Sequence, residues 1–128
     1  MPRPLVLRTL PGRFRVCRLD ADDAVPDWAL TSGALGSVTR TERELSVVCP
    51  EEAVPAGIAC SPAFGALEVS GPLDFAETGI LAALAHDLSQ AGVSHFALST
   101  YDTDYLLVPA ARLPEARRAL REGGHQVD

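Results

Sequence analysis

The sequence has little positive charge for its length, and this limits the partners that it binds. Its 128 residues include 11 Lys and Arg against 17 Asp and Glu, so the formal net charge is −6 at pH 7. Because nucleic-acid binding depends on clustered Lys and Arg that displace counterions from phosphates, we expect no nucleic-acid partner. Hydrophobic residues make up 47% and charged residues 22%, which is typical of a folded globular protein.

Cysteine is also scarce. The three thiols, Cys17, Cys49 and Cys60, are odd in number, widely separated and form no CxxC pair. This spacing favours neither a disulfide framework nor a zinc site. We therefore interpret the three cysteines as reduced, buried thiols of a structural kind.

Long hydrophobic runs are missing. The apolar segment near the N-terminus is interrupted by Pro4 and Arg8 and is too short for a signal peptide. No stretch approaches the roughly 20 apolar residues that a membrane-spanning helix requires. We expect a cytoplasmic protein without a membrane partner.

Motifs for enzyme chemistry are incomplete. Asp102-Thr103-Asp104 is similar to the paired aspartates that hold a divalent ion in sugar-transferring enzymes, but no nucleotide-binding glycine loop accompanies it. Residues 20–23, DADD, lack the Gly and Glu that would complete a calcium loop. The three histidines have no ligand spacing, and Ser46 and Ser99 belong to no nucleophile motif. We expect no enzyme activity, metal ion or cofactor; a small divalent-ion enzyme using Asp102 and Asp104 is the least favoured alternative.

The second half of the chain has a clear order of elements. The chain divides near Pro62, where residues rich in Pro, Ala and Gly separate two halves. Apolar residues at helical spacing and a terminating glycine predict each of two helices. The expected elements are a strand at 66–69, a helix carrying Ile80, Leu81, Leu84 and Leu88 and ending at Gly92, strands at 93–100 and 105–108, a helix from Pro114 to Gly123-Gly124, and a strand at 125–127. This order, βαββαβ, is that of a ferredoxin-like unit with both helices on one face.

The first half is predicted to be a degenerate copy of the same unit. Its expected elements are strands at 5–7 and 14–19, a short helix around 24–30, and strands at 35–41 and 44–49. The segment 40–48 aligns with 100–108 as a matching hairpin, with Glu44 against Asp104, and this supports an internal repeat; chance similarity between two amphipathic hairpins is the alternative. The fold class is therefore α+β, with two tandem ferredoxin-like units at 1–62 and 63–128.

The most informative stretch is STYDTDYLLV, residues 99–108, which places two aspartates at a reversal between two strands. We interpret Asp102 as a turn former through an Asx hydrogen bond. Asp104 stands at the entry to an apolar strand, where a carboxylate needs a cationic or hydrogen-bonding partner. Asp104 is therefore the better candidate for a ligand contact.

A second segment, residues 71–81, reads as a helix start. Asp74 and Glu77 have the spacing of a capping box, which is one explanation for Glu77. The unpaired N–H groups at a helix start attract carboxylates. Gly79 either fills a tight packing contact or lets a ligand approach the backbone. With Glu77 and Asp104 nearby, the helix amides would bind the carboxylate of a zwitterion and the acidic side chains its ammonium group or a cationic side chain.

Residues 71–108, GPLDFAETGILAALAHDLSQAGVSHFALSTYDTDYLLV, strongly resemble the amino-acid-binding ACT domains of the branch that includes the cytosolic arginine sensors called CASTOR. The resemblance covers roughly 65–124, and ELSVVCPEEAVP at 44–55 also looks like a signature of the family's first half. It implies paired ACT units in each chain and a regulatory protein that binds a free amino acid, with arginine or lysine as the first candidates. A ligand-free protein-interaction module of the same fold is the alternative.

The resemblance also implies a site and an assembly. The sensors have about twice this length and four units per chain, so this chain is expected to form a homodimer with its C-terminal units side by side. Because no enzyme or DNA-binding domain is fused to it, either any output would pass through an unknown protein partner or ligand binding would serve the stability of the dimer alone. The residues implied to contact ligand are Glu77, Thr78, Gly79, Ile80, Leu81, Thr100, Tyr101 and Asp104, with Ser99 contributed by the facing unit.

Overall fold

The computed structural model describes residues 3–31 and 33–128, and the chain forms two compact units. Unit 1 combines the segment up to Leu10 with Gly65–Asp128, and unit 2 spans Pro11–Phe64. The predicted division into 1–62 and 63–128 differs from these units mainly at the N-terminus, where the segment up to Leu10 belongs to unit 1. The reason is that strand β1 (Val6–Thr9) pairs with strands of unit 1. In the described part of the chain, neither helix is long and apolar enough to span a membrane.

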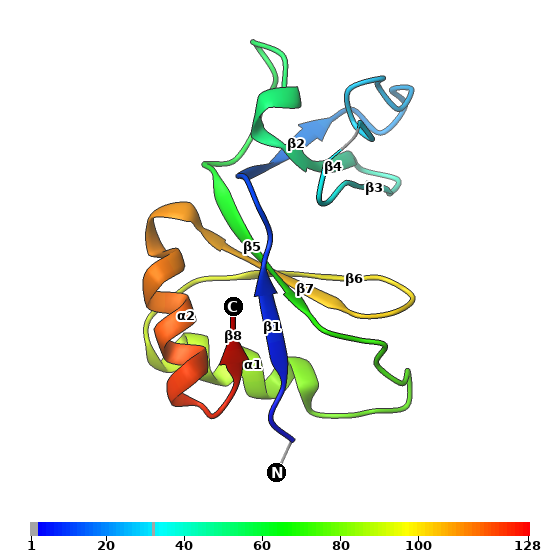
Figure 1. The fold of residues 1–128 in the computed structure, drawn as a ribbon. Coiled ribbons are helices and arrows are strands. Elements are labelled where there is room, and N and C mark those ends of the chain that lie inside the picture. The colour runs from blue at the N-terminus through cyan, green and yellow to red at the C-terminus, as the bar shows by residue number, and fades with distance from the viewer. Residues whose placement is uncertain (1–2, 32) are drawn as a thin grey trace. The chain divides into compact units, whose positions relative to one another are not determined.

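Unit 1 contains the predicted βαββαβ order and one added strand. The added strand β1 lies between the first and last strands of that order, antiparallel to β5 and parallel to β8. The sheet order in this unit is therefore β8-β1-β5-β7-β6 (Figure 1). The six elements are β5 (Phe64–Val69), α1 (Ile80–Gln90), β6 (Phe96–Ser99), β7 (Asp104–Pro109), α2 (Leu113–Glu122) and β8 (Gln126–Val127), with a short 3₁₀ helix at Ala110–Arg112 before α2.

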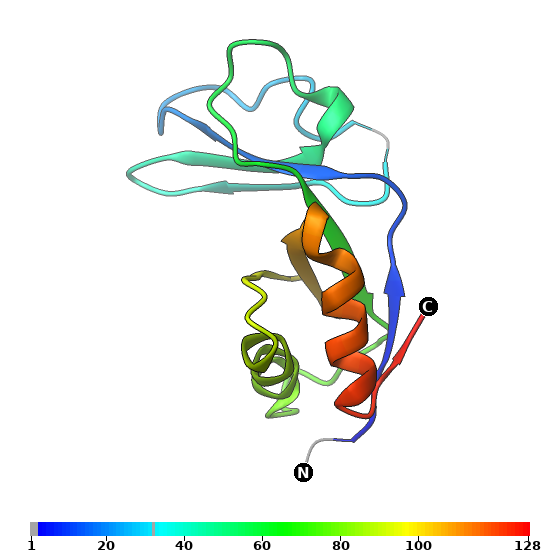
Figure 2. The same cartoon turned by 90° about the vertical axis from the view of Figure 1, so that its left-hand side faces the viewer.

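Both helices cover the same face of this sheet (Figure 2). Leu84 and Leu88 of α1 and Leu120 of α2 are fully buried in one core with alternate residues of the strands, such as Leu7 and Leu67. The helical period of 3.6 and the strand period of two bring these apolar residues to a common interface. The predicted α+β architecture is confirmed for unit 1.

Glycines end both helices, as the sequence predicts. At the end of α1, Gly92 has φ +71° and the Val93 N–H donates to the Leu88 carbonyl over 2.9 Å. At the end of α2, Gly124 has φ +98° and the His125 N–H donates to the Leu120 carbonyl over 3.1 Å. A left-handed residue followed by a bond across the last turn satisfies carbonyls that the helix leaves free.

Unit 2 is an antiparallel sheet of order β3-β4-β2, formed by β2 (Phe14–Leu19), β3 (Ser37–Arg40) and β4 (Leu45–Pro50). The 3₁₀ helix η1 (Glu51–Ala53) follows β4. The helix predicted around 24–30 is wrong: the chain makes turns there, and residues 11–31 and 33–64 contain no α-helix. Unit 2 therefore does not show the βαββαβ order expected of a degenerate copy.

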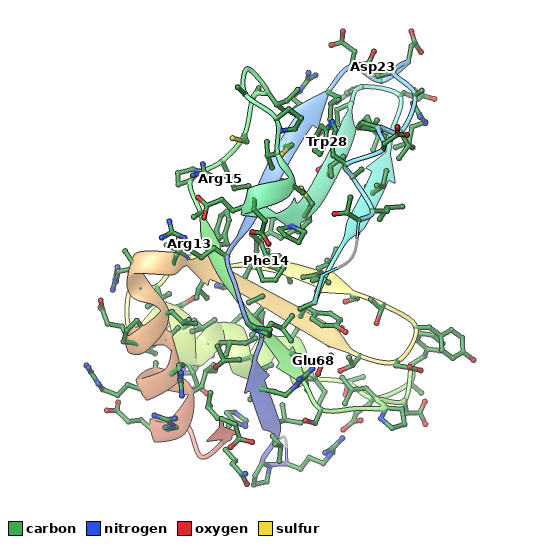
Figure 3. The ribbon with its side chains drawn as sticks, turned by 45° about the horizontal axis from the view of Figure 1, so that its top comes forward. Arg13, Phe14, Arg15, Asp23, Trp28 and Glu68 are labelled. Carbon is green, nitrogen blue, oxygen red and sulfur yellow. The ribbon has the colours of Figure 1, made fainter. Side chains whose placement is uncertain are left out.

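The core of unit 2 explains why a helical pattern at 24–30 is misleading. Ala29 is fully buried with Val47, and Trp28 packs against the same cluster (Figure 3). The apolar residues of this segment serve as single anchors of a loop, and the Ala29 N–H closes a turn on the Pro26 carbonyl. Tertiary packing of two neighbouring residues needs no helical period.

The two hairpins that the repeat prediction aligned do share a turn, but with a different register. In β3–β4 the Thr41 N–H donates to the Glu44 carbonyl over 2.9 Å, and in β6–β7 the Thr100 N–H donates to the Thr103 carbonyl over 2.8 Å. Glu44 is thus equivalent to Thr103, and the predicted match of Glu44 with Asp104 is wrong by one residue. A shift of one residue in a strand exchanges its two faces.

Candidate functional site

A hollow of about 320 Å³ lies in unit 1 between the segment that leads into α1 and the β6–β7 turn. Both segments were singled out in the sequence. The fold brings them together because β5 ends beside the β6–β7 turn, where the Thr103 hydroxyl donates to the Val69 carbonyl. Its lining residues are Leu73, Asp74, Phe75, Glu77, Gly79, Ile80, Leu81 and Ala82 from the first segment and the six residues 99–104 from the second.

Eight of the nine predicted ligand-contact residues line this hollow, and Thr78 does not. Ser99 was expected from a facing unit, but the structure places it in the hollow of its own chain. Six further lining residues were not predicted as ligand contacts: Leu73, Asp74, Phe75, Ala82, Asp102 and Thr103. Sequence reasoning had assigned Asp74 and Asp102 to structural roles, and it did not consider Phe75.

Two threonines hold the β6–β7 turn. The Thr100 hydroxyl donates to the Thr103 carbonyl over 3.2 Å, and the Thr103 hydroxyl donates to the Val69 carbonyl. The Asx role predicted for Asp102 is wrong: among the described residues its carboxylate makes no hydrogen bond, and its backbone carbonyl accepts from the Leu73 N–H over 2.7 Å. The Asp102 carboxylate is therefore exposed at the hollow with its acceptor capacity unused within the described residues.

Asp104 has the hydrogen-bonding partner that the sequence led us to expect. The Ser99 hydroxyl donates to Asp104 Oδ1 over 2.6 Å, across a directly paired position of β6 and β7. Because a hydroxyl is neutral, this bond orients the carboxylate without neutralising it. Asp104 is half-buried, and it presents an oriented negative charge at the hollow.

The start of α1 differs from the predicted capping box. Asp74 accepts from the Ala76 N–H over 2.9 Å through its side chain and from the Glu77 N–H over 2.9 Å through its carbonyl. These bonds make a separate turn, and the helix starts later, at Ile80, without a side-chain cap. Glu77 pairs instead with Arg3 (Nε to Oε2, 2.9 Å), which is an exposed ion pair of small energetic value.

Gly79 supplies the backbone conformation from which α1 begins. Its φ is +85°, and a Cβ built on it would have no atom within 4 Å. The packing explanation for Gly79 is therefore wrong, and the left-handed backbone itself requires glycine.

We expect Gly79→Ala to lower the free energy of unfolding by about 1–2 kcal/mol, the cost of a left-handed residue with a Cβ. Urea unfolding followed by circular dichroism measures this. Gly57→Ala is the matched control, because Gly57 has φ +86° and equally open space but lies in unit 2. A Gly79→Ala protein as stable as the wild type, beside a destabilised Gly57→Ala protein, would contradict the assignment.

Two exposed aromatic rings stand at the hollow. Phe75 is 75% exposed and Tyr101 is 80% exposed, and their rings meet edge to face with centroids 5.0 Å apart. The lining set includes four carboxylates and no basic side chain. Aromatic faces and carboxylates both attract cations, so the side chains of this hollow favour a positively charged group.

The described residues, 3–31 and 33–128, contain no group of three or more His, Cys, Asp or Glu side chains placed to hold a metal ion. What the hollow offers is an acidic, aromatic recess with the unpaired N–H groups of the α1 start at one side. This combination is a binding arrangement for a small molecule that carries both charges.

Comparison with known proteins adds family and fold. The ACT domain model matches residues 60–122, and a second model, for an N-terminal domain, matches residues 12–57. No curated protein sequence matches. The crystal structure of protein Atu0741 from Agobacterium tumefaciens is 35% identical, with a TM-score of 0.92 over 99% of this chain and 94% of that one.

More distant structures share the fold. A Vibrio cholerae protein, VC0802, described as a possible transport protein, has 22% identity and a TM-score of 0.77 over 93% of this chain and 89% of its own. The regulatory subunit of aspartate kinase from Thermus flavus has 11% identity and a TM-score of 0.60 over 95% of this chain and 97% of its own. The chain is thus related over nearly its whole length to protein Atu0741, and residues 60–122 carry a domain of the ACT family.

Proposed function

We propose that this chain is a non-catalytic regulatory protein that binds a free amino acid in the hollow between the α1 start and the β6–β7 turn. The observation that carries the proposal is that two separate segments, each predicted from sequence to contact ligand, line one recess of about 320 Å³. A recess of that size is at the lower end of small-molecule sites. The similarity of the chain's fold to that of a regulatory subunit of aspartate kinase supports a regulatory role.

The chemistry of the recess favours a basic amino acid such as arginine or lysine. The unpaired amides at the start of α1 would bind the α-carboxylate. Asp104, oriented by Ser99, and the exposed Asp102 carboxylate offer two separate negative charges for two positive groups. Phe75 and Tyr101 add aromatic surface next to them. A ligand with one positive charge would leave one carboxylate without a partner.

We further propose that the protein acts as a homodimer with its C-terminal units side by side, so that a second copy covers the ligand. The hollow is lined from one side of unit 1, and Phe75 and Tyr101 stand exposed at it. Sedimentation velocity with and without ligand tests this assembly. A monomer in both conditions at micromolar concentration would remove the dimer while leaving ligand binding in place.

Thermal unfolding with each of the twenty amino acids tests the function itself. A ligand that binds only the native state raises its stability as the concentration exceeds the dissociation constant. We expect arginine or lysine to raise the melting temperature most. Citrulline is the matched control for arginine, because it keeps the shape of the side chain and replaces its positively charged guanidinium by a neutral group. Unchanged melting curves at millimolar concentrations of all twenty would overturn the proposal.

The exposed ring pair supports one alternative, a ligand-free protein-interaction module. Large exposed aromatic residues are characteristic anchors of protein interfaces. In that case Tyr101→Ala would weaken binding to the unknown protein partner while Asp104→Ala would leave it intact. Amino-acid binding predicts that both substitutions reduce ligand affinity.

A further inference from the structure

All three cysteines of the chain lie near one another in unit 2. Cys17 of β2 and Cys49 of β4 are buried, and Cys60, on the segment that follows η1, is exposed. The expectation of buried thiols is therefore wrong for Cys60. Cys17 and Cys60 face each other in an isolated antiparallel bridge between β2 and the returning chain. Residues 43 positions apart in sequence thus become direct neighbours.

The hydrogen bonds around this bridge define its geometry. The Arg18 N–H donates to the Ala59 carbonyl over 2.9 Å, and the Ser61 N–H donates to the Val16 carbonyl over 2.8 Å. Both bonds flank the pair, so Cys17 and Cys60 occupy a non-hydrogen-bonded position. Cα atoms at such positions are about 4.5 Å apart with side chains on the same face. A disulfide requires a Cα separation of about 4.4–6.8 Å, so the pair is within bonding geometry.

The Cys17 and Cys49 thiols contact each other across β2 and β4, but their backbone positions are poorly suited to a disulfide. Across β2 and β4, Cys17 faces Val47 and Cys49 faces Arg15, so the two cysteines are diagonal neighbours. Diagonal Cα atoms in an antiparallel pair are about 7–8 Å apart. Beyond about 7 Å a disulfide cannot form without backbone movement. The backbone therefore selects Cys60 as the partner of Cys17.

The surroundings divide the two thiols by role. Cys60 faces solvent, and Arg15 Nη1 donates to its Sγ over 3.8 Å and to the Ser61 carbonyl over 2.8 Å (Figure 3). The same guanidinium also donates to Glu51 Oε1 over 2.7 Å, so the Arg15 side chain is held in place beside the Cys60 sulfur. Cys17 has no exposed surface, and its burial raises its pKa to about 12. Cys60 is the accessible thiol, and Cys17 is the thiol held behind it.

We propose that Cys17 and Cys60 are a redox site that forms a reversible intramolecular disulfide by exchange with a low-molecular-weight disulfide such as glutathione disulfide. The Cys60 thiolate attacks one sulfur of the small disulfide, forms a mixed disulfide and releases one thiolate. Cys17 then loses its proton to solvent, its thiolate attacks the Cys60 sulfur, and the second small thiolate leaves; both released small thiolates take up a proton from solvent. Two protein thiols are oxidised and one small disulfide is reduced to two thiols.

The high pKa of Cys17 sets the pH dependence of the second step. Below pH 12 the fraction of Cys17 thiolate, which is the attacking species, rises about tenfold with each pH unit. The mixed disulfide on Cys60 should therefore accumulate near pH 7 and convert to the intramolecular disulfide faster at pH 9. An excess of the small thiol should reverse both steps, because the Cys60 sulfur of the disulfide is exposed to solvent and can be attacked.

The test uses the full chain under native conditions, with acid quenching and intact-mass analysis after incubation with glutathione disulfide. The wild type and Cys49→Ala should lose two hydrogen atoms in mass. Cleavage after arginine and glutamate separates the three cysteines into different peptides, so the Cys17–Cys60 link can be assigned directly. Cys17→Ala should stop at the mixed disulfide, and Cys60→Ser should form neither product.

Two results would overturn the proposal. One is a disulfide between Cys17 and Cys49, which would appear equally in Cys60→Ser. The other is a mixed disulfide on Cys60 that persists in the wild type at pH 9. Cys60 is exposed, so Cys60→Ser should fold like the wild type, as circular dichroism can verify. If Cys17→Ala fails to fold, the peptide map of the wild type and Cys49→Ala still decides.

Discussion

Leu84→Ala should lower the free energy of unfolding by about 2–5 kcal/mol, the range seen when a buried leucine is truncated and leaves a cavity. Leu84 has no exposed surface and lies at the centre of the α1 face that covers the sheet of unit 1. Its neighbours along the helix, Ile80 and Leu88, are buried in the same core, so little solvent can enter and little side-chain movement can fill the space. Urea unfolding followed by far-UV circular dichroism measures the loss.

His86→Ala is the control on the same helix. His86 is exposed, and such surface substitutions usually change stability by no more than about 0.5 kcal/mol. The chain has one tryptophan, Trp28, which lies in unit 2, so its fluorescence follows that unit separately. A Leu84→Ala protein that unfolds at the same urea concentration as His86→Ala would contradict the described core.

Local sequence signals accounted for the elements of unit 1. The spacing of Ile80, Leu84 and Leu88 and the terminating Gly92 are contained within a few residues, so the helix they define could be predicted without knowledge of its surroundings. The pairing of β1 could not. A strand pattern at 5–7 says that a strand forms, but its partners β5 and β8 are about 60 and 120 residues away along the chain. Such long-range pairing leaves no local signal.

The candidate site shows the same division. The turn at 99–104 and the approach to α1 each carry turn and helix-start residues, so both segments could be recognised. Glu77 pairs with Arg3, which lies 74 positions away, and the predicted capping box is absent because the helix begins later, at Ile80. Phe75 has no local pattern that would mark it as a contact residue. Its exposure beside Tyr101 is visible only in the fold.

Asp104→Ala should weaken binding of the amino acid that stabilises the protein most by about 10- to 100-fold. A hydrogen bond to a charged group contributes about 1.5–3 kcal/mol, and each 1.4 kcal/mol is a factor of ten in affinity. The effect should exceed that of other lining carboxylates, because the Ser99 hydroxyl fixes the direction of the Asp104 carboxylate before ligand arrives. Isothermal titration calorimetry measures the affinity, and circular dichroism checks that the fold is retained.

Two matched variants separate charge from structure. Asp104→Asn keeps the shape and an acceptor for the Ser99 hydroxyl but removes the charge, so it should lose nearly as much affinity as Asp104→Ala. Asp22→Ala removes an exposed carboxylate of unit 2, so its affinity should equal that of the wild type. If Asp104→Asn binds like the wild type while Asp104→Ala does not, Asp104 acts only through its bond to Ser99, and a charge interaction with ligand is excluded. Equal losses of affinity in Asp104→Ala and Asp22→Ala would instead point to a general effect of net charge, because each substitution removes one negative charge from the protein. Such a long-range effect should also weaken as salt is added.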